Sequence, residues 1–277
     1  MSDPADLDEQ TAAVLEALKP RRRARPRLAE PLRDARDQEV DTPYGPVMAW
    51  RLDPFSGFGD SSGAAPATLL VHGWEDDNAL WSPLIDLLQE AGRPVVALDL
   101  PGHGFSPAEG CSVGRAAAAV RSVAEALGPV DTLVAHSFGC PVSTQAIADG
   151  MKIDRAVLIA TGWPAGANST RWTRIQEALG VDDAAIERAQ AIAAEADREF
   201  PPFDYLALAG RMTAKALFIH SLDDDGTEPD RSRDLADVWP GAGLQWTDGL
   251  GHRRIAQDAA ILQGVVEFVV RTNWLSY

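Results

Sequence analysis

Short apolar runs alternate with amphipathic segments along most of the chain. The runs are continuously apolar, which is typical of strands that are buried on both faces of a parallel sheet. They lie at residues 67–73, 94–100, 131–137, 155–161 and 215–221, with a weaker run at 244–248. Segments with apolar residues at helical spacing separate most of them, at residues 81–92, 114–128, 141–151, 230–239 and 258–274. This order predicts an α/β fold, with helices on both faces of a mostly parallel sheet.

Two segments depart from that rhythm. Residues 37–54 have the pattern of a β-hairpin that turns at TPYGP. Residues 161–213 have mostly helical character, and an insertion of this size between two strands is typical of a small cap over the strand ends. We therefore expect a core of residues 38–160 and 214–277, with a helical cap at 161–213.

The first 37 residues form an N-terminal arm with a different pattern. Four residues of the segment 5–18 share one helical face: Leu7, Val14, Leu15 and Leu18. The sequence KPRRRARPR at 19–27 then predicts a solvated Pro/Arg-rich linker, with a basic docking patch as the alternative. Because the apolar face needs a cover, we expect the helix to dock on the main domain or on a second copy of the chain.

Composition narrows the partners and the compartment. The formal charge of −16 argues against nucleic acid and against an anionic membrane surface as partners. No apolar run is long enough to span a membrane, and the N-terminus lacks a signal-peptide pattern, so we expect a cytoplasmic protein. The two cysteines, Cys111 and Cys140, lack metal-ligand spacing, so we expect free thiols and neither a metal nor another cofactor.

The stretch AHSFG, residues 135–139, places a serine between a strand and a helix. A strand that ends at Ala135 and a helix that starts near Gly139 would hold Ser137 on a sharp turn beside the helix N-terminus, where free N–H groups favour negative charge. The backbones on the two sides of such a turn pass close together. Small residues two positions before and two after the serine meet that demand.

These residues resemble the G-x-S-x-G nucleophile elbow of the α/β-hydrolase family, with Ala135 in place of the first glycine. Residues 72–74, His-Gly-Trp, are similar to the oxyanion-loop motif of that family, and DLPGHGFS at 99–106 is similar to the loop that follows it. The resemblance runs from about residue 40 to residue 277. It implies the α/β-hydrolase fold and a serine nucleophile.

A serine nucleophile needs a base that an acid orients. The family has the chain order serine, acid, histidine, and His252 follows the last strand and precedes the last helix, so it is the expected base for Ser137. The resemblance places the acid three residues after the small residue Ser221, which selects Asp224. Asp223 remains the alternative.

The resemblance also implies an oxyanion hole made by the backbone N–H groups of Trp74 and Phe138. In the cap, aromatic and basic side chains could line a substrate pocket, or they could be exposed helix residues. They are Trp163, Trp172, Arg171 and Arg174.

We therefore expect a serine hydrolase that cleaves a small-molecule ester or thioester through an acyl-enzyme. A serine at position 137 argues against the dehalogenases and epoxide hydrolases of the same fold, which require an aspartate there. Four alternatives stay open: an acyltransferase, a C–C bond hydrolase, a cofactor-free perhydrolase, and a ligand-binding member of the fold without turnover.

Overall fold

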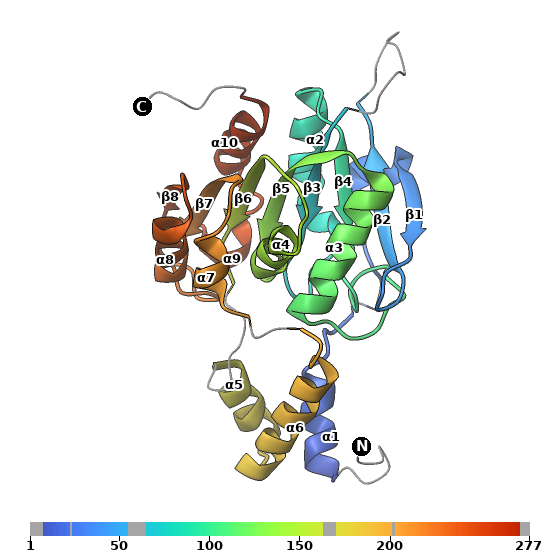
Figure 1. Ribbon diagram of the computed structural model, residues 1–277, viewed down its shortest axis with the longest axis vertical. Coiled ribbons are helices and arrows are strands. Elements are labelled where there is room, and N and C mark those ends of the chain that lie inside the picture. Colours follow the sequence, from blue (N-terminus) through green and yellow to red (C-terminus); the bar gives the residue numbers. More distant parts are fainter. Residues whose placement is uncertain (1–7, 23, 55–64, 163–169, 201–202, 272–277) are drawn as a thin grey trace.

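The computed structural model describes residues 8–22, 24–54, 65–162, 170–200 and 203–271. In these ranges eight strands form one sheet in the order β1-β2-β4-β3-β5-β6-β7-β8 (Figure 1). The strands are β1 (Arg36–Val40), β2 (Val47–Leu52), β3 (Ala67–Val71), β4 (Val95–Leu98), β5 (Val130–His136), β6 (Arg155–Ile159), β7 (Lys215–Ser221) and β8 (Gly243–Thr247). β2 is antiparallel to β1 and β4, and the other neighbours are parallel. The predicted α/β fold and hairpin are confirmed.

Helices cover both faces of the sheet (Figure 1). Those of the core are α2 (Ser82–Glu90), α3 (Val113–Leu127), α4 (Gly139–Ala148), α7 (Tyr205–Ala209), α8 (Asp230–Val238), α9 (Gly251–Arg254) and α10 (Ala259–Val270), with short 3-10 turns at Glu30–Asp34 and Asn78–Trp81. Side chains of α3, α4, α7 and α8 belong to one apolar cluster, and those of α2 and α10 belong to another. Of the helices in the described ranges, none is long and apolar enough to cross a membrane.

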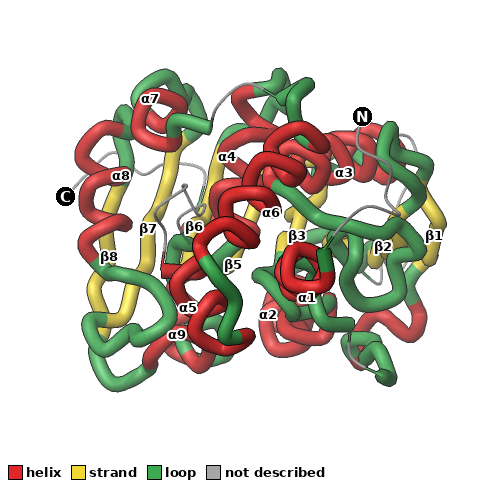
Figure 2. Tube along the Cα trace, turned by 90° about the horizontal axis from the view of Figure 1, so that it is seen from below, coloured by secondary structure: helices red, strands yellow, loops and turns green. Residues whose placement is uncertain are grey.

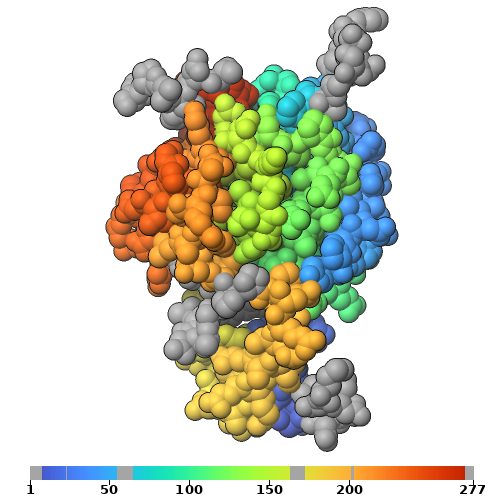
Figure 3. Space-filling view, viewed as in Figure 1, coloured from blue at the N-terminus to red at the C-terminus, as the bar shows by residue number. Residues whose placement is uncertain are grey.

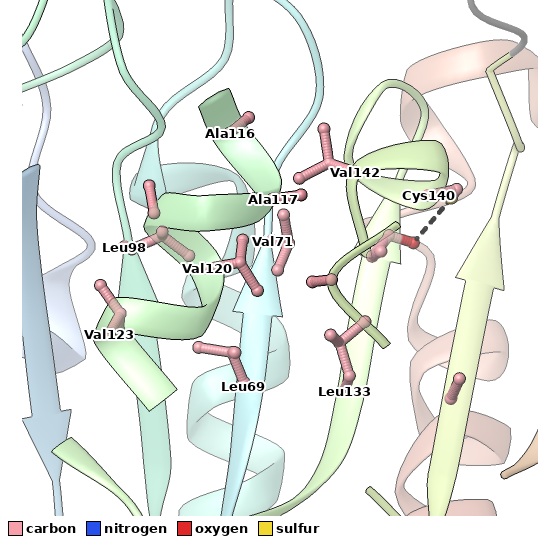
Figure 4. Packing of buried hydrophobic residues seen from close by; sticks show 14 of the residues in the cluster. Leu69, Val71, Leu98, Ala116, Ala117, Val120, Val123, Leu133, Cys140 and Val142 are labelled. Carbon is pink, nitrogen blue, oxygen red and sulfur yellow. Dashed lines mark hydrogen bonds between the residues drawn. The ribbon is translucent and has the colours of Figure 1, made fainter. Parts of the chain in front are cut away.

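Strand periodicity divides the core into these two clusters. Leu69 and Val71 of β3 lie in the first cluster, whereas Leu70 between them lies in the second. Figure 4 shows Val120 and Val123 of α3 lying over the first face. Both faces of the central strands β3 and β4 are buried, which explains why these strands appear as continuous apolar runs in the sequence. The carboxyl ends of the parallel strands consequently meet at one edge of the sheet.

A small helical lobe lies beyond this edge (Figures 1 and 2). It contains α5 (Thr170–Leu179) and α6 (Asp183–Ala196) from the insertion between β6 and β7, and also α1 (Glu9–Ala17) from the N-terminal arm. Val14 of α1 is fully buried against Ile186 and Ala189 of α6. The Asp8 carboxylate caps α1 and pairs with Arg188 of α6 at 2.7 Å.

The arm therefore docks on the cap of its own chain. Its apolar stripe requires a cover, but the cap and the core both offer helical apolar surface, and the pattern does not distinguish them. Leu15 packs at the margin of the same cluster, and Leu7 lies outside the described residues. Figure 3 shows the three-helix lobe projecting below the larger core.

The end of the predicted cap segment packs with the core instead of the lobe. Tyr205 and Ala209 of α7 are buried in the first core cluster, and α7 contacts α4 and α8. Helical periodicity shows that such a segment has an apolar face, but it does not show whether the core or the lobe covers that face. The described helices of the cap insertion are consequently α5 and α6.

Most described residues of the Pro/Arg-rich linker are exposed, as expected for a solvated linker, but the core holds the linker at several points. Pro20 is buried beside Gly102, and the Arg22 guanidinium donates to the carbonyl oxygens of Gly102 at 3.1 Å and Ala108 at 2.7 Å. The backbone N–H of Arg21 donates to the Glu75 carboxylate at 3.2 Å. These are carbonyl and backbone contacts, which composition does not reveal.

Candidate active site

Ser137 lies on a tight turn between β5 and α4. Its φ of +53° is left-handed, a region that a residue with a Cβ rarely adopts. Its N–H donates to the Ile159 carbonyl of β6 at 3.0 Å, which ties the turn to the neighbouring strand. A Cβ on Gly139 would lie 2.5 Å from the Val71 carbonyl oxygen, so that position requires glycine. Ala135 is accommodated, and its carbonyl accepts a hydrogen bond from Cys140 Sγ (Figure 4).

Two further glycines enclose this turn. A Cβ on Gly73, in the loop after β3, would lie 2.9 Å from Ser137 Cβ. A Cβ on Gly162, after β6, would lie 2.9 Å from the Ser137 carbonyl carbon and 3.1 Å from the Phe138 nitrogen. The backbone around Ser137 is therefore packed to a density that excludes side chains at both positions, which holds the serine in place.

His252 reaches Ser137 from the far end of the chain. It lies on α9, and its Nε2 is 2.9 Å from Ser137 Oγ. Its Nδ1 is 2.9 Å from Asp224 Oδ2. An ionised carboxylate only accepts, so Nδ1 carries the proton and Nε2 is left to accept from the serine hydroxyl. This is the tautomer in which an imidazole can take a proton from Ser137.

Asp224 is a buried carboxylate with both oxygens engaged. Oδ1 accepts from the backbone N–H groups of Gly226 at 2.7 Å and Thr227 at 2.8 Å. Oδ2 accepts from His252 and also from His220 Nε2 at 3.0 Å. Burial acts to raise the pKa of Asp224, but the hydrogen bonds from His220, His252 and Thr227 outweigh it and hold that pKa below its ordinary value. The carboxylate is thus an anion at neutral pH.

Asp223, the alternative acid, has a different environment. Its exposed carboxylate accepts from the Ser221 hydroxyl and, at 3.0 Å, from the backbone N–H of Gly251. The Ser221 hydrogen bond is the main cause that lowers the pKa of Asp223. Since Gly251 precedes His252, Asp223 fastens the histidine loop to the end of β7. In the structure, Asp224 is the carboxylate that contacts the imidazole.

The predicted oxyanion-hole residues lie on two sides of the serine. Phe138 directly follows Ser137 and precedes the first residue of α4, where backbone N–H groups have no partner inside the helix. Trp74 follows Gly73, and its indole packs edge-to-face on the rings of Phe138 and His103 at centroid distances of 5.2 and 5.3 Å. The two loops that carry the predicted donors are thereby packed together.

Three other histidines support loops around the site. His72 accepts from the Leu100 N–H at 3.0 Å, and His103 donates to the Pro101 carbonyl at 2.8 Å. His136 Nε2 lies 2.8 Å from the backbone oxygen of His252, so it must donate there. Burial is the main cause that lowers the pKa of His103 and of His136 to about 3, so both stay neutral. In the described ranges no group of His, Cys, Asp and Glu could hold a metal ion.

Two contacts of the site were missed from the sequence. An ion pair joins Arg253, next to His252, to the buried Asp76 of the loop that carries Trp74. His220 shares the Asp224 carboxylate with His252. The position of His220 four residues before Asp224 was visible in the sequence, but its contact depends on where the strand end and the following loop turn.

The proposed pocket residues of the cap are only partly described. Trp163 lies outside the described residues, as does the side chain of Arg171. Trp172 is half-buried and packs against the cluster around Val14, and Arg174 is exposed. In the structure Trp172 therefore contributes to the packing of the lobe.

The profile of the Alpha/beta hydrolase family matches residues 68–263. Since this range is most of the chain and the fold agrees, the protein belongs to the alpha/beta hydrolase family and is a hydrolase by class.

Relatives with curated names support this assignment. The chain is 27% identical over 246 residues to a putative carbamate hydrolase RutD of Variovorax paradoxus, which covers 75% of this chain and 92% of that protein. It is 42% identical over 50 residues to a pimeloyl-[acyl-carrier protein] methyl ester esterase of Methylococcus capsulatus. That second match covers 18% of this chain and only 19% of the relative.

Solved structures share the fold at low sequence identity. An esterase of Pyrococcus furiosus is similar with a TM-score of 0.66 and 17% identity, covering 91% of this chain and 96% of that one. Carboxylesterase CesB of Bacillus subtilis is similar with a TM-score of 0.63 and 16% identity, covering 94% of this chain and 97% of that one. At these identities the likeness shows the fold alone.

Proposed function

We propose that the protein hydrolyses a small-molecule ester or thioester through an acyl-enzyme on Ser137. The observation that carries the proposal is the unbroken series of contacts from Ser137 Oγ to His252 Nε2 and from His252 Nδ1 to Asp224, both at 2.9 Å. These are the distances at which a general base can take a proton from a nucleophile that an acid helps to orient.

The chemistry follows from this geometry. Ser137 Oγ attacks the substrate carbonyl carbon while its proton passes to His252 Nε2, and the carbonyl oxygen gains the negative charge. The tetrahedral adduct collapses, and the leaving alcohol or thiol takes the proton from His252. Water then attacks the acyl-enzyme, with His252 as base, and the carboxylic acid and the free serine are released. Asp224 stays ionised and stabilises the imidazolium.

Backbone N–H groups would stabilise the oxyanion. In our proposal Phe138 and Trp74 supply the two donors, at the start of α4 and in the loop after β3. Each donor of this kind contributes about 3 kcal/mol to transition-state stabilisation, because it is fixed in place before the charge forms. The close approach of Gly73 and Gly162 to the elbow supports this role, since it leaves no room for a side chain beside Ser137 and the Phe138 nitrogen.

The names of the relatives suggest which acyl groups to test. One relative is named as a methyl ester esterase and another as a putative carbamate hydrolase. Both reactions begin with attack on a carbonyl carbon, so the same triad could serve either one. We place the ester first because the methyl ester esterase match has the higher local identity. We keep the carbamate as the second candidate because the carbamate hydrolase match, although less identical, spans more of the chain.

A substrate panel tests the proposal. Initial rates are measured at pH 7.5 for p-nitrophenyl acetate, butyrate and octanoate, an acyl thioester and an aryl carbamate. We expect turnover of at least one ester or thioester, and a fall of about a thousandfold or more in kcat for a folded Ser137→Ala variant. Product analysis with an added alcohol separates hydrolysis from acyl transfer. Turnover of the carbamate alone, or equal rates in Ser137→Ala, would contradict the proposal.

A further inference from the structure

We infer that His220 is a positioning residue of the site, which acts on His252 by sharing the carboxylate of Asp224. The inference rests on the proposed function of the Ser137 site and deepens it. His220 lies near the end of β7, and its side chain is fully buried. It does not contact Ser137 in any described interaction; its effect would pass through the acid.

The two histidines converge on one oxygen. Asp224 Oδ2 is 2.9 Å from His252 Nδ1 and 3.0 Å from His220 Nε2. The Thr227 hydroxyl also donates to this oxygen at 3.1 Å, and the other oxygen is occupied by two backbone N–H groups. The carboxylate therefore cannot rotate without breaking several hydrogen bonds. Its negative charge stabilises all of these donors, and His252 is only one of them.

The two ring nitrogens of His220 have different partners. Its Nδ1 is 2.7 Å from the Ser232 hydroxyl on α8, and that serine is fully buried. Since the ionised Asp224 carboxylate can only accept, His220 must carry a proton on Nε2, and the Ser232 hydroxyl holds the Nδ1 side of the ring. α8 thereby helps to hold the ring of His220 in the orientation in which Nε2 donates to Asp224.

This arrangement has a consequence for the catalytic base. A carboxylate that also serves His220 exerts a weaker field on His252 than one that serves His252 alone. The other groups that face His252 are the neutral ring of His136 at a centroid distance of 5.0 Å and the ion pair between Arg253 and Asp76. Asp223 acts from the exposed side through Gly251. Removing the His220 donor therefore alters the nearest charge and leaves the others in place.

Kinetics of two variants separate positioning from a purely structural role. His220→Leu removes the donor, whereas His220→Gln keeps an N–H near the place of Nε2. For His220→Leu we expect kcat on a p-nitrophenyl ester to fall about tenfold, while KM stays within about twofold. The expected loss is smaller than the roughly 10²–10⁴-fold effect of a general base, because His252 itself remains in place. The midpoint of the acidic limb of kcat/KM should rise by about half a pH unit. His220→Gln should restore both values toward wild type.

Phe218→Leu, in the same strand and buried in the core, is the matched control: it should lower Tm without moving the acidic limb. An unchanged or lowered limb in His220→Leu, or equal behaviour of His220→Leu and His220→Gln, would overturn the inference.

A measurement on the wild-type chain needs neither folding of a variant nor turnover. Long-range ¹⁵N–¹H NMR at pH 7 should find a proton on Nε2 of His220, and an Nε2 without a proton would overturn the inference. NMR titration of His252 in the wild type and the variants should show the same upward shift as the kinetic limb. If no ester is turned over, the proposed function fails, while the NMR result still decides the role of His220.

Discussion

Replacing Gly226 by alanine should disable the proposed triad without unfolding the protein. A Cβ at this position would lie 2.7 Å from His252 Cγ, 3.0 Å from Cδ2 and 3.1 Å from Cβ. Carbon atoms in contact prefer about 3.5–4.0 Å, so the imidazole has to move by about 1 Å. A shift of that size lengthens the 2.9 Å contact with Ser137 Oγ beyond hydrogen-bonding distance. Misplacement by about 1 Å costs about 10²-fold in rate.

The substitution should leave stability intact. Gly226 is exposed, its φ lies outside the left-handed region, and alanine keeps the N–H that donates to Asp224. We therefore expect kcat on p-nitrophenyl butyrate to fall about a hundredfold, while Tm in differential scanning fluorimetry stays close to that of the wild type, because the smaller entropy of the unfolded chain offsets the local overlap. Gly264→Ala in α10, where a Cβ meets nothing within 4 Å, is the control and should keep full activity. A folded Gly226→Ala variant within threefold of wild-type kcat would refute the reasoning.

Three further predictions follow from the same contacts. Asp224→Asn should lower kcat by at least a hundredfold more than Asp223→Asn, since only Asp224 contacts the imidazole; the reverse ranking in ester assays would move the acid to Asp223. Deleting residues 1–18 removes the helix that covers α5 and α6, so limited proteolysis should cut the cap sooner, while kcat on a small ester stays within about threefold of wild type. An unchanged rate of proteolysis would contradict this packing. Burial lowers the pKa of His103 to about 3, so its contribution to the free energy of unfolding is present above about pH 6.5 and is lost as the pH falls toward 3. In denaturant titrations between about pH 6 and 4, His103→Gln should remove about 1.4 kcal/mol of this loss per pH unit.

The fold was predictable because burial on both faces leaves a strong pattern. Val134 and Ala135 of β5 face opposite clusters, and both must be apolar, so the strand appears as an uninterrupted run. The alternation with helices then specifies a parallel sheet. The order of the strands within that sheet does not follow from these runs, because each of them is apolar enough to occupy a central position.

The candidate site was partly predictable for a different reason. Ser137, Asp224 and His252 each follow a strand, and parallel strands bring their carboxyl ends to one edge, so chain order alone suggests that they meet. Other contacts depend on where loops turn. The pairing of Arg253 with Asp76 and the second contact of Asp224 with His220 join segments that no local pattern relates.

The docking of the N-terminal arm shows a similar limit. The apolar stripe around Val14 indicates that something covers the helix, and the structure identifies the cover as the cap. The sequence of an apolar stripe does not indicate the shape or charge of the surface that covers it, so it does not select one partner surface. The ion pair of Asp8 with Arg188 adds a polar contact at this surface, but the two residues are far apart in the chain and the sequence does not relate them.

Covalent labelling of the nucleophile tests the central claim most directly. The full-length protein is treated with a fluorophosphonate at pH 7.5, and the modified peptide is located by tandem mass spectrometry. Our account predicts stoichiometric labelling of Ser137, slow labelling in His252→Ala and none in Ser137→Ala, because the hydroxyl reacts only when the imidazole takes its proton. A folded wild-type protein that stays unlabelled, or that carries the label on another residue, would contradict the account.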